Sequence, residues 1–515
     1  MKKFFLFASI LIGMLACAPK PKEILSNKTT TEIKKPNIVI FYVDDLGYGD
    51  ISCYGATSVA TPYVDQLAKN GIQFTDAHSS ASTCTPSRYS LLTGQYAFRN
   101  NAAILPGDAP LLIDIKLATL PRMLHNAGYQ TAIVGKWHLG LGDGTIDWNK
   151  EVKPGPLEIG FDYSFLLPST GDRVPTTYLE NHNIINLDPN DPLLVSYKKP
   201  FVGVKTGITN PELLRFAADK QHSDAITNGV SRIGNQTGGK SAMWIDEEFP
   251  SVLYEKATQF IDKNKDNPFF LLFSFHDIHV PRLPNKQFQG KTTMGPRGDA
   301  IVQMDWMTGQ VMKKLESLGL DKNTLIIFTS DNGPVLNDGY EDGAVEKLGN
   351  HKPGGVFKGG KYSSFEAGTR VPMITYWPGT IKAGVSDALI SQIDYFASLG
   401  KLVNGTIAKG DAFDSEDHLN ALLNANKPAR KMLLEEGYTL AIRNNNFKYI
   451  APISKKQVFP NWIKNKGVEG GVTLEPQLFN LSNDFGEQVD IALKNKDLVT
   501  KFQSQIDSIV AISKK

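Results

Sequence analysis

The sequence is poor in cysteine, in net charge and in repeated patterns. Three cysteines among 515 residues are too few for a disulfide-based scaffold. The 55 lysines and arginines nearly cancel the 53 aspartates and glutamates, so the net charge of +2 gives no support for nucleic-acid binding driven by bulk charge. We find no internal repeat, no coiled-coil pattern and no aromatic run typical of a carbohydrate-binding module. With 41% hydrophobic residues, the chain can bury a large core, and its length favours one large domain with a smaller one.

An apolar run near the N-terminus is too short to cross a membrane. It extends from Phe4 to Ala16 after Lys2 and Lys3, whereas a crossing takes about 20 residues. This pattern is typical of a secretory signal peptide, which we place at residues 1–16. We therefore expect secretion across the inner membrane.

The end of this run predicts a lipid anchor. Met14-Leu15-Ala16-Cys17 resembles the bacterial lipobox, in which the cysteine is acylated and becomes the new N-terminus. Ordinary cleavage near Ala16–Ala18, with Cys17 incidental, is the alternative. Residues 17–35 are rich in Lys, Thr, Pro and Asn and are predicted to form a flexible tether. We expect the chain to be anchored by lipid to a bacterial membrane, on the periplasmic or the cell-surface side of the outer membrane.

Short apolar segments alternate with helical patterns along most of the chain. Strands are predicted at Asn37–Val43, Thr131–Val134, Pro268–Phe275 and Thr324–Thr329. Their near-continuous hydrophobicity is expected of strands buried on both faces. Helices are predicted at Thr61–Asn70, Leu117–Asn126 and Asp299–Leu318. The alternation predicts an α/β fold, in which a large, mostly parallel or mixed sheet is sandwiched by helices.

The pattern changes near residue 430. Short strands are predicted at Tyr438–Arg443, Asn446–Ile450 and Gln477–Asn480, followed by a helix at Lys496–Ile512. We therefore predict a main domain at residues 36–430 and a smaller C-terminal α+β subdomain, with an antiparallel sheet, at residues 431–515. The loop-rich stretch at residues 155–239 is of the kind that tends to be functional.

Each of the four apolar strands ends in polar side chains. In chain order these are Asp44 and Asp45, Lys136 and His138, His276 and His279, and Asp331 and Asn332. Asp and Asn are also common in turns, so each pair alone carries little information. In open α/β sheets, however, the ligand crevice lies at the carboxyl ends of the strands. Together, these residues therefore predict one functional site at that edge.

The segment Cys84-Thr85-Pro86-Ser87-Arg88 is the most informative motif. A bridge between Cys53 and Cys84 is the simplest structural use of the two cysteines, but the residues around Cys84 argue against it. A cysteine followed by an arginine also suggests a thiolate phosphatase. Those enzymes need five intervening residues for a loop of amides around the phosphate, and only three are present here, which disfavours that interpretation.

The segment instead resembles the signature of type I sulfatases of the alkaline-phosphatase superfamily, C-x-P-S-R-x-x-x-x-T-G, which ends here at Thr93-Gly94. Further similarities follow in the family's order: Asp44-Asp45, Gly135-Lys136-Trp137-His138-Leu139-Gly140, His279-Val280-Pro281, Ser330-Asp331-Asn332-Gly333, and Gly360-Lys361 ahead of Phe365-Glu366-Ala367-Gly368-Thr369-Arg370. Ala367 replaces the usual first glycine of the last motif. The resemblance extends from about Pro36 to Pro378 and makes residues 36–430 the expected catalytic domain.

The resemblance implies that Cys84 is oxidised to formylglycine (3-oxoalanine) by a maturation enzyme. It also implies a metal site formed by Asp44, Asp45, residue 84, Asp331 and Asn332. Hard oxygen ligands favour Ca²⁺ or Mg²⁺ over zinc. A thiol suits such an ion poorly, whereas the two hydroxyls of a hydrated aldehyde suit it well. One hydroxyl is expected to attack sulfur, and collapse of the other is expected to expel the sulfate.

Roles for the remaining residues follow from the same resemblance. Arg88 is expected to hold the aldehyde hydrate, and Lys136 and Lys361 to neutralise the sulfate oxygens. We expect His279 to protonate the leaving oxygen, and His138 to deprotonate the hydrate. His276, Asp172 and Arg173 are candidates for substrate contact, although a salt-bridged turn explains Asp172 and Arg173 equally well.

A lipoprotein signal together with this motif set resembles the polysaccharide-degrading systems of Bacteroidetes. The predicted substrate is therefore a sulfated poly- or oligosaccharide, from which inorganic sulfate is released. The sugar itself does not follow from fold and chemistry. Two alternatives stay open at this point: a phosphonate or phosphodiester hydrolase of the same superfamily, and a non-catalytic glycan-binding lipoprotein with a decayed site.

Overall fold

The central strands are the most hydrophobic segments of the chain, and they are buried along their whole length. Strands β1 (Asn37–Val43), β12 (Phe269–Ser274) and β13 (Thr324–Ser330) contain only buried residues. Along β1, Ile38 and Ile40 enter one hydrophobic core and Val39 and Phe41 the other, as the two-residue period of a strand requires. Burying one such side chain contributes about 1.5–3 kcal/mol. This burial places β1 at the centre of the fold.

The structure is a computed structural model, and it describes Met1 and residues 35–512 except residues 445, 458, 459 and 465. The predicted signal peptide and tether, with Cys17, lie outside the described residues apart from Met1 and Lys35. Among the helices of the described part, none has both the length and the hydrophobicity needed to cross a membrane.

A ten-stranded mixed sheet forms the middle layer. Its order is β15-β2-β14-β13-β1-β12-β4-β5-β6-β7. The five strands from β13 to β5 are parallel, and β14 and β6 add antiparallel neighbours. The other strands of this sheet are β2 (Ile72–Phe74), β4 (Gln130–Lys136), β5 (Tyr163–Leu167), β6 (Leu179–Glu180), β7 (Asn183–Ile184), β14 (Met373–Tyr376) and β15 (Gly384–Ser386).

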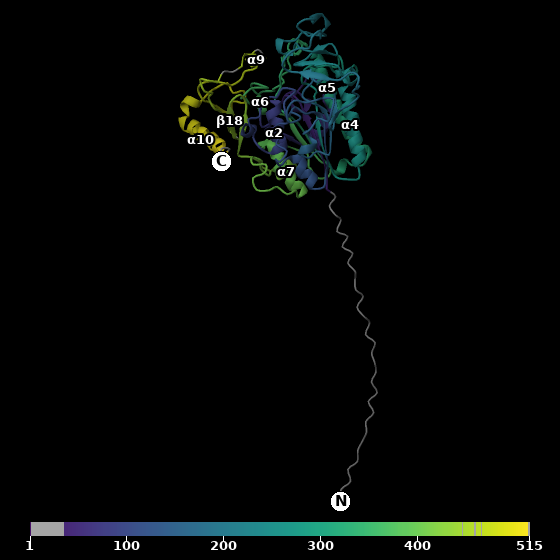
Figure 1. Cartoon of the computed structure of the whole chain (residues 1–515). Helices are drawn as coiled ribbons and strands as arrows, with labels where there is room; N and C mark the ends of the chain where they lie inside the picture. The colour runs from purple at the N-terminus through teal and green to yellow at the C-terminus, as the bar shows by residue number, and fades with distance from the viewer. Residues whose placement is uncertain (2–34, 445, 458–459, 465, 513–515) are drawn as a thin grey trace. The chain divides into compact units, whose positions relative to one another are not determined.

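Helices cover both faces of this sheet (Figure 1). On one face lie α1 (Pro62–Asn70), α4 (Phe249–Asn264) and α5 (Gly295–Ser317), which share a core with Val39 and Phe41. On the other lie α2 (Cys84–Thr93), α3 (Leu120–Asn126) and α7 (Tyr395–Val403), which share a core with Ile38 and Ile40. The predicted fold class, a mostly parallel sheet sandwiched by helices, is therefore confirmed.

The C-terminal part forms a four-stranded antiparallel sheet with a terminal helix. The strands are β17 (Met432–Glu436), β18 (Leu440–Asn444), β19 (Phe447–Ile450) and β20 (Gln477–Asn480). Helix α10 (Lys496–Ile512) packs Phe502 and Ile506 against Tyr449 and Leu478. The small antiparallel sheet and the last helix agree with expectation. The boundary at residue 431 stays a prediction, because the described residues from Lys35 onward form one compact unit.

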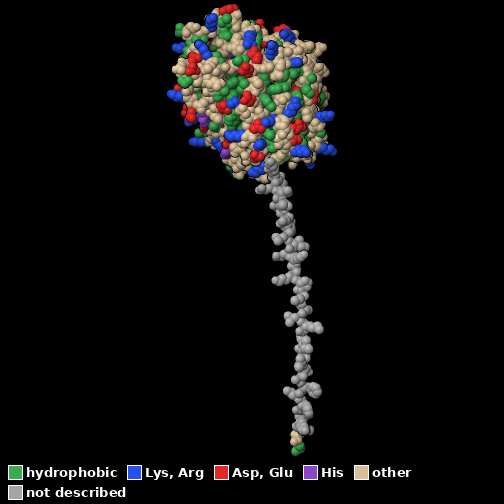
Figure 2. Space-filling model, turned by 90° about the vertical axis from the view of Figure 1, so that its right-hand side faces the viewer, with side chains coloured by type: hydrophobic (Ala, Val, Ile, Leu, Met, Phe, Trp, Pro, Cys, Tyr) green, Lys and Arg blue, Asp and Glu red, His purple; other side chains and the backbone are tan. Residues whose placement is uncertain are grey.

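Some elements differ from the sequence-based expectation. Helices α2 and α4 and strand β17 were not predicted, and the loop-rich stretch 155–239 holds only short strands and single helical turns. Cys53 and Cys84 are both free, so no disulfide joins them. Figure 2 shows acidic and basic side chains interspersed over the visible face of the molecule, which fits a net charge of +2.

Candidate active site

Four adjacent parallel strands deliver the predicted site residues to one edge of the sheet. In the order β13-β1-β12-β4, the strands are followed by Asp331-Asn332, Asp44-Asp45 and His276–His279, while β4 ends at Lys136, two residues before His138. Helix α2 begins at Cys84 beside them and ends at Thr93, and the φ of +64° at the following Gly94 is typical of a helix C-cap glycine. The structure therefore brings the strand ends and Cys84 together.

Tight backbone geometry supports this convergence. A Cβ at Gly135 would lie 1.8 Å from the carbonyl oxygen of Ser274 on the neighbouring strand, so only glycine fits between β4 and β12. Four non-glycine residues near the site have positive φ: Asp45 (+58°), His138 (+55°), Ile278 (+81°) and Tyr362 (+73°). Such conformations are costly, above all for a β-branched residue, and they cluster at functional sites.

Buried carboxylates crowd around Cys84. Asp44, Asp45, Cys84 and Asp331 each offer one atom within 4.8 Å of the others. Burial raises the pKa of Asp44 to about 8, although Lys136 opposes the shift, and burial also raises the pKa of Asp45. The loss of water and the neighbouring carboxylates thus outweigh the lysines beside Asp44 and Asp45.

Asn332 indicates what completes the cluster. Its amide nitrogen donates to Asp45 Oδ1 at 2.8 Å, while its Oδ1 is buried and has no hydrogen-bond partner among the described residues. Three carboxylates and one orphaned amide oxygen form a set of hard oxygen donors. This set fits a hard divalent cation such as Ca²⁺ or Mg²⁺.

Arg88 holds its position through several hydrogen bonds. Its Nε and Nη2 donate to Asp331 Oδ2 at 3.0 and 2.7 Å, and its Nη1 donates to Ser274 Oγ at 2.6 Å. Although burial works in the opposite direction, Arg88 keeps the pKa of Asp331 below its usual value. The guanidinium is thus fixed one helical turn from Cys84.

The Cys84 thiol is a weak nucleophile in this environment. Its Sγ lies 3.6 Å from Asp44 Oδ1. Burial raises the pKa of the thiol, and the neighbouring lysines do not offset the shift. With its pKa raised, an unmodified Cys84 is protonated at neutral pH. The thiolate is the reactive form, so the protonated side chain is a poor nucleophile. This argues further against thiolate chemistry and for a modified side chain.

The two predicted sulfate-binding lysines are buried beside the carboxylates. Lys136 Nζ lies 2.5 Å from Asp44 Oδ2. Lys361 Nζ lies 2.9 Å from both Asp45 Oδ2 and Asp338 Oδ2. Both ammonium groups are therefore close enough to act electrostatically on residue 84, and Lys361 also lines the pocket that holds it.

His138 has the hydrogen bonding of a base. Its Nε2 lies 3.1 Å from the carbonyl oxygen of Leu105, which can only accept, so Nε2 carries the proton. Nδ1 is buried without a partner among the described residues. Burial, reinforced by Lys136, lowers the pKa of His138 well below its usual value. The ring is therefore neutral, and Nδ1 is free to accept a proton.

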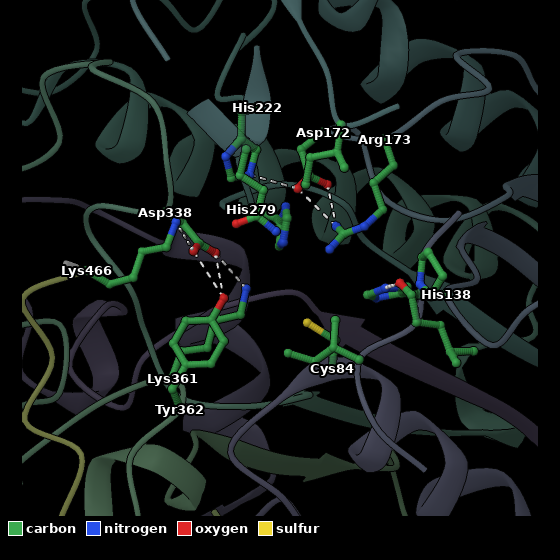
Figure 3. Close-up of a pocket in the computed structure, with 15 residues that line it drawn as sticks. Cys84, His138, Asp172, Arg173, His222, His279, Asp338, Lys361, Tyr362 and Lys466 are labelled. Atoms are coloured by element: carbon green, nitrogen blue, oxygen red, sulfur yellow. Dashed lines mark hydrogen bonds and ion pairs between the residues drawn. The ribbon is translucent and has the colours of Figure 1, made fainter. Parts of the chain in front are cut away.

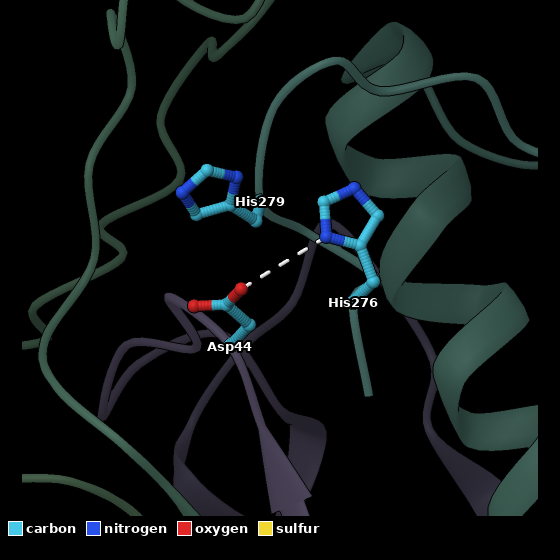
Figure 4. A group of neighbouring side chains, drawn as sticks. All are labelled: Asp44, His276 and His279. Carbon is cyan, nitrogen blue, oxygen red and sulfur yellow. Dashed lines mark ion pairs between the residues drawn. The ribbon is translucent and has the colours of Figure 1, made fainter. Parts of the chain in front are cut away.

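His279 and His276 follow the same strand but lie differently. His279 Nδ1 donates to the carbonyl oxygen of Val280 at 2.7 Å, so its Nε2 is unprotonated. Burial and the nearby lysines lower the pKa of His279, and a bound anion acts in the opposite direction. His276 Nδ1 lies 4.0 Å from Asp44 Oδ2 (Figure 4). The ring packs on Phe249 and does not line the pocket that holds Cys84, so its predicted substrate contact stays a prediction.

A pocket of about 310 Å³ opens above Cys84. Its lining includes His138, Asp172, Arg173, His279 and Lys361, and Figure 3 shows these side chains around the Cys84 sulfur. Arg173 Nη1 lies 2.8 Å from Asp172 Oδ1. This salt bridge is what the structural-turn interpretation predicts. The pair also lines the pocket, as the substrate-contact interpretation requires.

The pocket also contains residues that the sequence motifs did not reveal. His222, Asp338, Tyr362 and Lys466 line it. His222 Nε2 lies 3.3 Å from Asp172 Oδ2, and its Nδ1 lies 2.7 Å from Asp219 Oδ1. Burial alone would lower the pKa of His222, but its hydrogen bonds to the two carboxylates raise it. His222 therefore carries charge more readily than an ordinary histidine.

Lys466 extends this arrangement from the C-terminal sheet region. Its Nζ lies 3.6 Å from Asp219 Oδ2 and 3.2 Å from Asp338 Oδ1, but it makes no hydrogen bond among the described residues. Charges of alternating sign thus run around the pocket. We call this set the charge belt: Arg173, Asp172, His222, Asp219, Lys466, Asp338 and Lys361. Sequence reasoning found Lys361 through the Gly360-Lys361 motif and singled out Asp172 and Arg173, but no motif marks the other four residues.

Comparisons with known proteins give a consistent result. A family model described as Sulfatase matches residues 36–406. An N-acetylgalactosamine-6-O-sulfatase of Bacteroides thetaiotaomicron is 46% identical over 480 residues, covering 92% of this chain and 93% of that protein. Human arylsulfatase A is 30% identical over 403 residues, covering 78% and 70%.

Solved structures agree with these sequence matches. A 6S-sulfatase structure from work on glycosaminoglycan metabolism by Bacteroides thetaiotaomicron has a TM-score of 0.90 at 46% identity, covering 92% of this chain and 99% of that one. A phosphonate monoester hydrolase of Agrobacterium radiobacter has a TM-score of 0.57 at 17% identity, covering 93% and 96%, and this likeness shows the fold alone.

Proposed function

Because this chain belongs to the sulfatase family and is thus a sulfuric ester hydrolase, we propose that it removes 6-O-sulfate from N-acetylgalactosamine in a sulfated glycan of the glycosaminoglycan type. The observation that carries the proposal is the 46% identity to an N-acetylgalactosamine-6-O-sulfatase over nearly the full length of both chains. The pocket above Cys84, with about 310 Å³, is a suitable size for one sugar ring.

We propose that Asp44, Asp45, Asp331 and Asn332 hold Ca²⁺, with residue 84 as a further ligand after its oxidation to formylglycine. When bound, the ion and the hydrated aldehyde supply positive charge and a nucleophilic hydroxyl. The orphaned Asn332 Oδ1 and the raised pKa of Asp44 support a cation in this place. Arg88 keeps Asp331 ionised and oriented.

The chain's own residues then bind the sulfate and move protons. Lys136 and Lys361 neutralise the non-bridging oxygens, and both are held in place by carboxylates. His138 accepts a proton at Nδ1, because its Nε2 is committed to Leu105. His279 protonates the departing sugar oxygen from Nε2, for which the bound sulfate must first raise the pKa of His279. The charge belt orients the sugar hydroxyls above the ester.

Release of inorganic sulfate from defined saccharides tests the proposal. Matured protein is incubated with N-acetylgalactosamine 6-sulfate and with its 4-sulfate isomer, with Cys84→Ala as the blank. We expect release from the 6-sulfate and much less from the 4-sulfate. Absence of release from every sulfated saccharide by protein shown to be matured would contradict the proposal.

The two alternatives have weaker support. A phosphonate or phosphodiester hydrolase rests on a likeness of fold at 17% identity, and initial rates on paired sulfate and phosphate esters separate the two activities. A non-catalytic glycan-binding protein requires a decayed site, whereas the acids, lysines and histidines of the motifs are all present and lie together.

Location and maturation are separate parts of the proposal. We propose that Cys17 is acylated and anchors the chain to the outer membrane, and that a formylglycine-generating enzyme acts on Cys84. The lipobox-like sequence supports the first and the C-x-P-S-R motif the second. We expect the full chain to partition into the detergent phase, and we expect the Cys17→Ser variant to lose this partition. Equal partition of both proteins contradicts the anchor.

A further inference from the structure

A second cavity adjoins the active-site pocket. Its volume of about 340 Å³ lies within the range of small-molecule sites, about 300–1,000 Å³. Ile104 and Tyr362 line both spaces. Thr83 lines the second cavity, and the next residue, Cys84, lines the first. We call the second cavity the side groove. The two cavities therefore share part of their walls.

The side groove lies between the two parts of the fold. Ala103 and Ile104 of the main domain form one side, and Tyr438, Pro460 and Ile463 of the C-terminal part form the other. Ile463 lies three residues before Lys466, which lines the active-site pocket. One C-terminal segment therefore contributes to both spaces.

The floor of the side groove is fixed to the active site by backbone hydrogen bonds. The Ser82 carbonyl oxygen accepts from the amide of Tyr362 at 2.8 Å, and the Ser82 amide donates to the carbonyl oxygen of Glu436 at 2.8 Å. The Ser82 hydroxyl is buried there without a hydrogen-bond partner among the described residues. Ser82 is itself fully buried, so it fixes the floor of the groove from below, and the floor is thus preorganised.

We infer that the side groove binds the sugar residue linked to the sulfated one, an inference that rests on the proposed function. A pyranose ring presents flat faces of C–H groups and a rim of hydroxyls. The aliphatic and aromatic side chains of Ile104, Ile463 and Tyr438 suit the faces, and Thr83, which lines the groove and is partly exposed, offers a hydroxyl to the rim. The groove shares Ile104 and Tyr362 with the sulfate-binding pocket, so it is the neighbouring space that we assign to the next unit of the glycan chain.

Two variants alter the side groove in opposite ways. Ala103 is exposed, so Ala103→Trp fills the groove without entering the core, while Tyr438→Ala removes part of its wall. Matched controls lie in another cavity, which Phe413 and Ala429 line: Phe413→Ala and Ala429→Trp. For each protein, kcat/KM is measured on N-acetylgalactosamine 6-sulfate and on a disaccharide that carries the same sulfated sugar at its non-reducing end.

The ratio of the two kcat/KM values gives the result. We expect the wild type and both controls to prefer the disaccharide, and Ala103→Trp to reduce that preference about tenfold, with a smaller reduction in Tyr438→Ala. A ratio that neither variant changes overturns the inference while leaving the proposed function intact. If the wild type hydrolyses neither substrate, the proposed function fails, and the inference fails with it.

Discussion

The active site and the interdomain cluster are both built from buried acids and buried cations, yet their charges are balanced differently. The interdomain cluster joins the main domain to the C-terminal sheet and consists of Asp76, His78, Glu366, Arg370, Glu435, Arg443 and Lys448. Its geometry also offers three possible metal ligands, Asp76, His78 and Glu366. Geometry alone therefore does not separate the two regions.

The number of cations that pair with each buried acid does separate the active site from the interdomain cluster. Asp76 lies 2.9 Å from His78, 3.2 Å from Arg370 and 2.9 Å from Arg443. Glu366 likewise contacts two arginines and Lys448. These cations outweigh burial and lower the pKa of Asp76 and Glu366, whereas the pKa of Asp44 and Asp45 is raised. Asp76 and Glu366 each meet three cations, whereas Asp44 and Asp45 each meet one lysine, and this difference favours a further cation at the active site.

The largest expected effect is at residue 84. Cys84→Ala should lower kcat on the order of 10⁴-fold or more, because it removes the nucleophile, while the thermal unfolding midpoint changes little. Cys53→Ala is the matched control, since Cys53 is half-buried and outside the site, and it should keep its activity. Substantial turnover by Cys84→Ala would contradict the assigned nucleophile.

The interdomain cluster should affect stability rather than chemistry. Lys448→Met removes one buried cation that pairs with both Glu366 and Glu435, so unfolding should require about 3–5 kcal/mol less free energy. The folded fraction should keep its kcat/KM. The exposed Lys431→Met should change stability by no more than about 0.5 kcal/mol. If Lys448→Met reduced kcat without reducing stability, the structural assignment of this cluster would be wrong.

Added calcium should stabilise only through the active site. At about 100 times its dissociation constant, a ligand that binds the folded state adds about 2.7 kcal/mol. We expect Ca²⁺ to raise the unfolding midpoint of the wild type, and EDTA to reverse this. In Asp331→Asn, Ca²⁺ should no longer raise the unfolding midpoint, whereas in Asp76→Asn it should still do so. The reverse pattern would place the ion in the interdomain cluster.

The smallest expected effect is the pH dependence due to His222. Its folded-state pKa is raised, so the folded protein holds this proton more tightly than the unfolded chain does. The resulting stabilisation is complete below the ordinary histidine pKa of about 6.5 and is lost as the pH rises through the folded-state pKa. The difference in unfolding free energy between wild type and His222→Gln should therefore shrink with rising pH. A difference that grows with rising pH would show that folding lowers the pKa of His222 instead of raising it.

The sequence predicted those parts of the fold and site that are encoded locally. A continuous apolar run marks β1, and the polar residues just after it must lie at the sheet edge, so Asp44 and Asp45 could be placed without a structure. Cys84 and Arg88 are held one turn apart on a helix, and a short motif therefore specifies them both.

Residues that depend on long-range packing could not be predicted in this way. His222, Asp338 and Lys466 come from three separate segments: Lys466 pairs directly with Asp338, and Asp219 joins Lys466 to His222. No hydrophobic period or spacing marks them. His276 shows a limit of the local pattern, because its position after β12 suggested a substrate contact that stays a prediction, while its ring packs on Phe249 and does not line the pocket.

The most direct test of the account is the mass of the peptide that contains residue 84, taken from active protein. We expect the mass of formylglycine or its hydrate, with the modified fraction proportional to specific activity across preparations. Active protein in which residue 84 is entirely unmodified cysteine would contradict the account.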